Sequence, residues 1–293
     1  MKNAFNKAFV ALPLVAALAA CGGGNDDSPT TAAPLSEGGT GKVGAAADGR
    51  AIATAQASAT AASDAAAAAV GAPFQTDASS RFFILGNDIN EANLVEFGIT
   101  QRADGAVVRM DNLSLIGDDA AVESIAGDAS FAMGRWALGI FRLFSFDQPI
   151  TAGSTGYHYI VFNGVAAFPG SGSYTCDTGT FTAPSRLSGS GQLTGVASGT
   201  ASLSFAPAGA IVQSTIQVRA NGFLGTQSFS TADTPLETPD HYLKTPGFVD
   251  SSGNGLLLTV GAAPGNAMRV VVPYQVPVRG IGYRGIATFV CTP

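Results

Sequence analysis

The feature that most constrains the fold is an alternation of apolar and polar residues with a period of two, repeated along the C-terminal half of the chain. Between residues 211 and 221, for example, Ile216 and Val218 fall on one face, and Gln217 and Arg219 on the other. A period of two is the period of a β-strand. One apolar face per strand predicts an antiparallel sheet wrapped around a core.

Eight segments of this kind, separated by Gly, Pro, Asn and Asp, occur between Phe131 and Cys291. Regularly spaced short strands are typical of barrels and sandwiches, and closure of a barrel removes exposed strand edges. The sequence therefore predicts a mainly β protein with an eight-stranded antiparallel β-barrel over residues 131–293. The expected strands are 131–145, 157–164, 171–177, 179–183, 192–206, 211–221, 266–276 and 280–291.

Residues 80–130 give weaker strand signals, at 81–86, 94–101 and 105–115. We expect these strands to form a small β handle that packs on the side of the barrel. The stretch from Asn221 to Leu256 is rich in Pro, Asp, Ser and Gly and reads as a long loop. Long loops often carry function.

The N-terminus has the parts of an export signal, with Lys2 and Lys7 followed by an apolar stretch that is too short to cross a bilayer. Leu18-Ala19-Ala20-Cys21 matches the lipobox of bacterial lipoprotein signal peptides. We expect residues 1–20 to be removed as a signal peptide and Cys21 to receive acyl chains such as palmitate, which anchor the protein to a membrane. The alternative is a buried N-terminal helix.

Gly22 follows the expected lipidation site. By resemblance to other lipoproteins, the absence of Asp at this position implies sorting to the outer membrane. The resemblance does not distinguish its inner leaflet from its outer leaflet. No later apolar stretch reaches the ~20 residues of a membrane span, so we expect the mature chain to be anchored without crossing.

Residues 21–79 form a low-complexity arm that is mostly Ala, Thr, Ser and Gly between Ala45 and Ala72. Such a segment lacks the large apolar side chains that would offset its ordering entropy, so we expect disorder. An Ala-rich helix over about 52–70 is the alternative. In either form the arm would lift a folded domain away from the membrane.

The net charge is -6 and only 12% of residues are charged. Because no basic stretch is present to follow a phosphate backbone, we expect no nucleic-acid partner.

Three cysteines are present, and Cys176 and Cys291 remain once Cys21 is assigned to lipidation. In an oxidising compartment an even pair predicts one disulfide, worth about 4–5 kcal/mol in the chain-entropy model. Two buried free thiols are the alternative.

Several short motifs occur in a consistent order. They are Gly134-Arg135-Trp136, His158 to Val161 with Asn163-Gly164, Pro169 to Cys176, Gly195 to Phe205, and Gly285 to Phe289. In this order they resemble the β-barrel module of transferrin-binding protein B and its relatives, which include the factor H binding proteins. The resemblance covers about residues 130–293 together with the anchor and arm, and corresponds to one lobe. It implies a surface lipoprotein with a barrel beside a strand-rich handle, and it carries over no ligand-contact residue.

Signals for catalysis or metal binding are weak. His158 and His241 are the only histidines, and a metal site normally gathers three or four ligands, so we expect no metal and treat both as ordinary surface histidines, with haem ligation as the alternative. Asp118, Asp119, Glu123 and Asp128 could supply oxygen ligands to calcium, but solvated loop charge is the simpler interpretation.

Two further motifs have structural explanations. Residues 280–285 match Gly-x-Gly-x-x-Gly, but no helix follows, so glycine kinks in a curved strand explain them better. Gly134-x-Trp136 matches the short lipocalin signature, or else marks a Trp packed at the bottom of the barrel. No Gly-x-Ser-x-Gly elbow occurs, and we expect neither an enzyme nor a cofactor.

Together these features predict an outer-membrane or cell-surface lipoprotein whose barrel binds a protein or solute ligand, for instance a host or environmental protein. One alternative is a periplasm-facing carrier that holds a small apolar ligand or haem inside the barrel. Another is a structural envelope lipoprotein without a ligand. An interior filled by large side chains would count against the carrier. The ligand-binding residues are unknown at this level.

Overall fold

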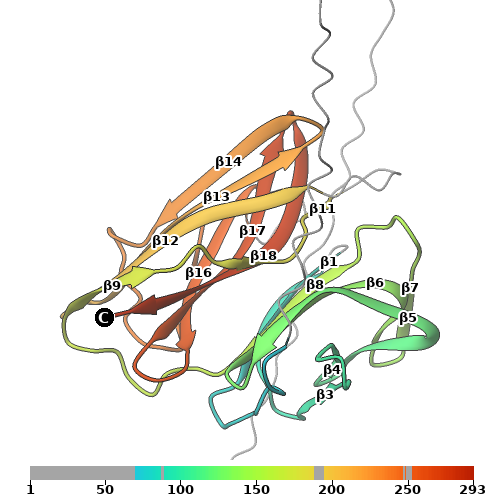
Figure 1. Cartoon of the computed structure of the whole chain (residues 1–293), viewed down its shortest axis with the longest axis horizontal. Coiled ribbons are helices and arrows are strands. Elements are labelled where there is room, and N and C mark those ends of the chain that lie inside the picture. The colour runs from blue at the N-terminus through green and yellow to red at the C-terminus, as the bar shows by residue number, and fades with distance from the viewer. Residues whose placement is uncertain (1–69, 87–88, 188–194, 247, 249–252) are drawn as a thin grey trace, which may run out of the picture. The chain divides into compact units, whose positions relative to one another are not determined.

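A computed structural model describes residues 70–86, 89–187, 195–246, 248 and 253–293. The expected signal peptide, Cys21 and most of the expected arm lie outside the described residues. All regular secondary structure in the described part is β, arranged as two antiparallel sheets that Figure 1 draws in cyan to green and in yellow to red. The prediction of a mainly β protein is confirmed. Within the described ranges, no helix suited to crossing a membrane is found.

The first sheet has eight strands in the order β2-β1-β8-β6-β5-β4-β3, with β7 paired to β6. The strands are β1 (Arg81–Gly86), β2 (Ile89–Leu94), β3 (Ile99–Gln101), β4 (Val107–Met110), β5 (Leu113–Asp128), β6 (Phe131–Leu143), β7 (Phe146–Ile150) and β8 (Tyr157–Phe162).

The first sheet curls around an aromatic core. Phe141 and Tyr157 stack with ring centroids 4.2 Å apart, and Trp136 packs against Tyr159. The Trp136 indole N–H donates a 2.7 Å hydrogen bond to the Val107 carbonyl, and the Tyr159 hydroxyl accepts one of 2.9 Å from the Val107 N–H. Because both polar tips are satisfied, these large rings can be fully buried without a desolvation penalty.

The second sheet has ten strands in the order β14-β13-β12-β9-β18-β17-β16-β15, with β10 and β11 also paired to β18. The strands are β9 (Gly172–Cys176), β10 (Thr180–Phe181), β11 (Ser185–Arg186), β12 (Val196–Ala206), β13 (Gly209–Ala220), β14 (Phe223–Ser230), β15 (Leu243–Lys244), β16 (Gly255–Ala262), β17 (Met268–Val278) and β18 (Ile281–Thr292).

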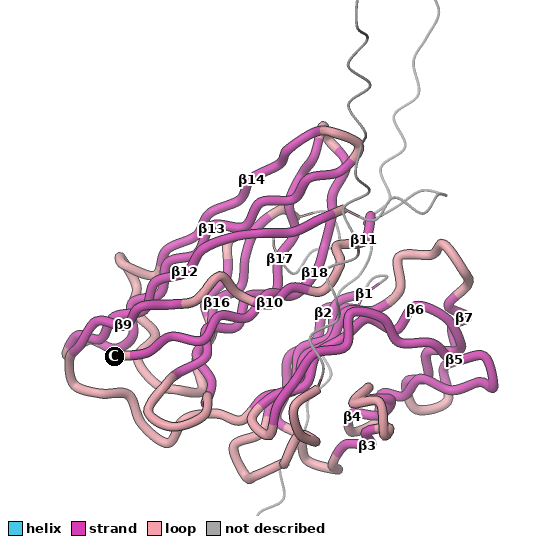
Figure 2. The backbone as a smooth tube through the Cα atoms, in the orientation of Figure 1, coloured by secondary structure: helices cyan, strands magenta, loops and turns pink. Residues whose placement is uncertain are grey.

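The second sheet curls around a mainly aliphatic core, in which Val212, Val270 and Val272 are fully buried together with Tyr274. The curl brings β14 back against β17 and β16, as the tube in Figure 2 shows. At Gly225 in β14 a side chain would overlap the backbone of Pro277 at the end of β17. Glycine at this position therefore permits the close return of the strand.

An apolar cluster joins the two sheets. Phe83 and Phe162 from the first sheet pack with Val271 and Ile286 from the second, and all four are buried. In each sheet, the face that meets the other sheet here is opposite to the face that lines the sheet's own core. The strands β1, β8, β17 and β18 are therefore covered on both faces. Strands covered in this way read as continuous buried runs, as in β8.

The single eight-stranded barrel is not confirmed. The expected strands at 131–145 and 157–164 correspond to β6 and β8, which hydrogen-bond within the first sheet, where β8 also pairs with β1. The remaining expected strands lie in the second sheet. In the expected loop region from 221 to 256 the structure has β14, β15 and the start of β16.

Candidate functional site

An open groove of about 330 Å³ lies at the edge of the first sheet, between β2 and the turns that follow β4 and β6. We call it the aromatic groove and define it by six of the residues that line it. These are Glu91, Leu94, Glu96, Phe97, Asp111 and Phe144.

Three large apolar side chains of the aromatic groove are exposed. The exposed fractions are 70% for Phe144, 64% for Phe97 and 48% for Leu94. Phe146, which follows the turn in β7, is also exposed. Single exposed apolar residues are common on proteins, but several gathered around one hollow make this place a candidate interaction surface.

Asp111 fixes the segment that carries Phe97. Its carboxylate accepts hydrogen bonds from the N–H groups of Phe97, at 2.8 Å, and Glu96, at 3.2 Å. The Asp111 N–H donates in turn to the Gly98 carbonyl at 3.0 Å. This reciprocal pattern ties the chain between β2 and β3 to the turn after β4. Phe97 therefore stands on a rigid support although its ring faces solvent.

The backbone of Phe144 is strained. It opens the two-residue turn between Leu143 and Phe146, which pair with each other, and its φ angle is 53°. A left-handed backbone costs a bulky L-residue about 1–2 kcal/mol. The matching turn between β13 and β14 has Asn221 at this place, with φ 50°, followed by glycine. Asparagine tolerates this conformation, so Phe144 is not the residue that turn geometry favours.

The rim of the aromatic groove is acidic. Glu91, Glu96 and Asp111 line it together with Leu94 and Phe97, and of the three acidic residues Glu96 is exposed and Asp111 is buried. The Glu91 carboxylate accepts a 2.5 Å hydrogen bond from the Asn93 amide, which leaves its charge in place. The nearby Arg109 guanidinium donates to the Asp111 carbonyl at 3.0 Å.

The interiors of both sheets are occupied by side chains. Trp136, Tyr157 and Tyr159 fill the first, and Tyr274, Tyr283 and Phe289 are among those that fill the second. A second open hollow, of about 430 Å³, lies on the exposed face of β12, β13 and β14. Hydroxyl and amide groups dominate its lining, and no charged residue contributes to it. The described hollows are therefore surface features.

Cys176 and Cys291 face each other in the ladder between β9 and β18, with their sulfur atoms at disulfide-bond distance. The pairing joins the first strand of the second sheet to its last. Cys21 lies outside the described residues.

His158 is buried between the two sheets, so its expected placement on the surface is wrong. Its two ring nitrogens lie 2.8 Å from the hydroxyl oxygens of Thr182 and Ser185. Burial lowers the pKa of His158 well below 6.5, and the nearby charges of Arg135 and Arg284 lower it further. The alternation that put His158 on an outward face was read correctly, but the second sheet covers that face. His241 is exposed.

The four acidic residues expected near residue 120 do not gather around one point. Glu123 pairs with the buried Arg135 on β6, and Asp128 pairs with Arg269 on β17. Asp118 and Asp119 are exposed on β5. Among the residues that the structure describes, no group of three His, Cys, Asp or Glu side chains is placed to hold a metal ion.

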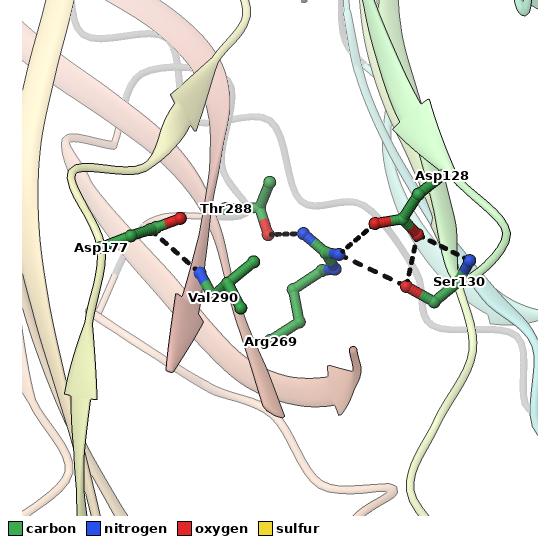
Figure 3. Close-up of polar contacts among 6 residues, drawn as sticks. All are labelled: Asp128, Ser130, Asp177, Arg269, Thr288 and Val290. Atoms are coloured by element: carbon green, nitrogen blue, oxygen red, sulfur yellow. Dashed lines mark hydrogen bonds and ion pairs between the residues drawn. The ribbon is translucent and has the colours of Figure 1, made fainter. Parts of the chain in front are cut away.

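Arg269 links the second sheet to the first, as Figure 3 shows. Its guanidinium donates to the Asp128 carboxylate at 3.0 Å and to the Ser130 hydroxyl at 3.3 Å. It also lies 3.7 Å from the centroid of the Phe131 ring. The Arg269 side chain is only 2% exposed and that of Asp128 is 31% exposed, so this ion pair is a largely covered connection between the sheets.

The remaining motifs have structural roles. Trp136 is fully buried in the core of the first sheet. Gly280, with φ 78°, completes the turn between β17 and β18. The aromatic groove was missed at the sequence level because Phe97 and Phe144 lie in turns, outside the alternating pattern. The closest signal is Phe144-Ser145-Phe146, two aromatic residues in a short polar connection.

No protein-family model, curated protein or solved structure matches the chain.

Proposed function

We propose that the protein is a lipid-anchored, non-catalytic binding protein of the outer membrane, possessing an exposed site for a partner protein at the aromatic groove. The observation that carries the proposal is that Leu94, Phe97 and Phe144 stay exposed around one hollow on a rigid support. Exposed apolar groups cost solubility, and a protein partner that covers them offers a reason for their presence.

The filled interiors favour recognition at the outer surface over carriage of a solute inside a barrel. Large buried rings occupy the space in which an apolar ligand or haem would lie. A carrier role therefore receives no support from the packing of the described strands.

We also propose a relationship to the transferrin-binding protein B-like lipoproteins, in which the second sheet closes as a barrel and the first sheet serves as the handle. The curled second sheet, with β14 returning against β17, supports this proposal. So does the order of motifs along residues 130–293.

The anchor is tested by metabolic labelling with palmitate. We expect the full chain to incorporate label and to sediment with the outer membrane, and Cys21→Ser to lose both properties. Unchanged labelling of the Ser variant would contradict the anchor. Protease treatment of intact cells then reports the leaflet, since digestion requires exposure at the cell surface.

The binding site is tested by photo-crosslinking in intact cells. A benzoylphenylalanine residue replaces Phe144 in one variant and Phe223, an exposed aromatic residue of the second sheet, in a matched control. We expect position 144 to yield an adduct with one identified protein, and Phe97→Ser to abolish that adduct. Equal adducts from both positions, or none from position 144, would contradict a partner site at the groove.

A further inference from the structure

We infer that the aromatic groove receives a basic segment of the partner protein, one in which an aromatic or large aliphatic residue is flanked by lysines or arginines. This inference rests on the proposed function and adds the chemical class of the ligand. Two independent features of the groove support the inference. One is the negative charge of its rim, and the other is the exposure of its fixed aromatic rings.

The rim selects for positive charge. Glu91, Glu96 and Asp111 line the groove together with Phe97 and Phe144, and Glu96 is itself exposed. Of two nearby arginines, Arg142 pairs with Asp147 at 2.6 Å, whereas Arg109 donates to the neutral Asp111 carbonyl and keeps its charge beside the groove. The three carboxylates outnumber this arginine charge, so the rim attracts a cationic segment and repels an acidic one, which gives charge selectivity beyond apolar contact.

The exposed rings add to this preference, because the face of an aromatic ring attracts a cation. The same chain shows the contact twice, with Arg269 over Phe131 at 3.7 Å and Arg279 over Phe223 at 3.4 Å. In both cases the aromatic ring has an arginine of its own chain. For Phe97 and Phe144 we expect the cation to come from the partner.

Preorganisation identifies the apolar part of the ligand. Phe144 keeps its ring in solvent at the expense of a left-handed backbone, and Asp111 fixes Phe97 through its two backbone acceptor contacts. Backbone outliers that persist on a surface are candidates for a ligand clamp. A pair of fixed rings around one hollow suits a single large apolar side chain inserted from the partner.

The test uses the full chain and three fluorescein-labelled peptides, measured by fluorescence anisotropy. The first alternates lysine with leucine and phenylalanine, the second replaces its lysines with glutamates, and the third replaces its apolar residues with serines. We expect the first to bind at least tenfold more tightly than either of the others, and its affinity to fall as salt is raised.

Variants assign the binding to the groove. Glu91→Gln with Glu96→Gln should weaken binding of the basic apolar peptide about tenfold and reduce its salt dependence. Phe144→Asn should weaken binding without unfolding the chain, because asparagine suits the turn. The charge-matched control, Asp233→Asn with Glu237→Gln in the connection between β14 and β15, should bind as the parent does. Equal binding of the basic and acidic peptides, or unchanged binding by Phe144→Asn, would reject the inference.

Other occupants give distinct results. Dimerisation that Phe144→Asn abolishes, seen by sedimentation, would reject a separate partner in favour of a second copy. An adduct from position 144 to residues 22–69 of the same chain would reject it in favour of the arm. If position 144 crosslinks to another protein while the peptides show no charge preference, the inference fails and the proposed function stands. If no other protein is crosslinked, the proposed function fails.

Discussion

Each of the two sheets buries one face in a core of its own. They differ in the composition of that core and in the residues that form their tight turns. The second sheet has a valine-rich core and the well-suited Asn221-Gly222 turn between β13 and β14. The first has an aromatic core and Phe144 in the equivalent place of its β6–β7 turn. Both sheets have a bulky residue in a left-handed turn, but Arg279 of the second sheet lies over the ring of Phe223, whereas the Phe144 ring of the first sheet is 70% exposed. This difference is the reason that we place the proposed recognition surface on the first sheet.

The largest expected effect concerns the second sheet. Replacing Cys176 and Cys291 together by Ser removes a link between residues 115 positions apart. We expect the free energy of unfolding to fall by about 4–5 kcal/mol in the chain-entropy model, measured by urea unfolding. Hydrogen exchange should rise first in β9 and β18. Equal loss of protection in β6 and β8 would show that the two sheets unfold as one unit and would weaken the comparison.

The next largest expected effect concerns the ion pair between the two sheets. Arg269→Met leaves the Asp128 carboxylate without its cation at a mostly covered site, and we expect a loss of about 3 kcal/mol in unfolding free energy. Arg142→Met provides the control, because its pair with Asp147 is exposed, and should leave stability unchanged. A similar loss from both variants would contradict the role of burial.

The pH dependence of stability tests the other polar contact between the sheets. The pKa of His158 lies well below 6.5 in the folded protein because of burial and the charges of Arg135 and Arg284. The unfolded chain therefore binds the proton first as pH falls below about 6.5. We expect stability to decline over the window below that pH, by up to about 1.4 kcal/mol per pH unit, until the folded pKa is reached.

The control for this pH effect is His158→Gln, which should flatten that part of the profile, whereas the exposed His241→Gln should not. Urea midpoints measured at several pH values give the comparison. A parent profile that matches His158→Gln below pH 6.5 would refute the assignment.

The smallest effect compares the two turns directly. Phe144→Asn should raise the unfolding free energy by roughly 1 kcal/mol, because it relieves a left-handed phenylalanine whose exposed ring loses little burial. Asn221→Phe should lower it by a similar amount. Thermal unfolding of both variants measures the pair. If Phe144→Asn is destabilising, the ring contributes to packing and its strain has a structural explanation.

The sequence predicts strands where apolar and polar residues alternate, and fails where this pattern is hidden. β12 and β13 fall close to the expected ranges because only one of their faces is apolar, and β17 and β18 do so although both faces are covered, because residues such as Arg269 and Arg284 keep their second face partly polar. β14 was missed since its side chains are mostly exposed, and β16 since both of its faces are buried, which removes the alternation. A period of two reveals that a strand has a covered face, but not which strand pairs with it. The alternation alone therefore could not show that β6 and β8 pair within the first sheet and not with the strands of the expected barrel.

The candidate site is less predictable than the fold. Phe97 and Phe144 belong to turns, and only the structure shows that their rings line one groove. The pairing of Cys176 with Cys291 followed from counting cysteines. The burial of His158 did not follow, because it depends on contact between two sheets that lie far apart in sequence.

The return of β14 against β17 has a consequence for molecules held close together. An open sheet edge offers its backbone to a strand of any neighbouring copy, and crowding on a surface would favour such contacts. Gly225 brings one face of β14 against Pro277, but this contact leaves the edge of the strand unpaired. Among the described strands, β14 and β15 end the second sheet, so their outer edges are the places where a neighbouring copy would add a strand.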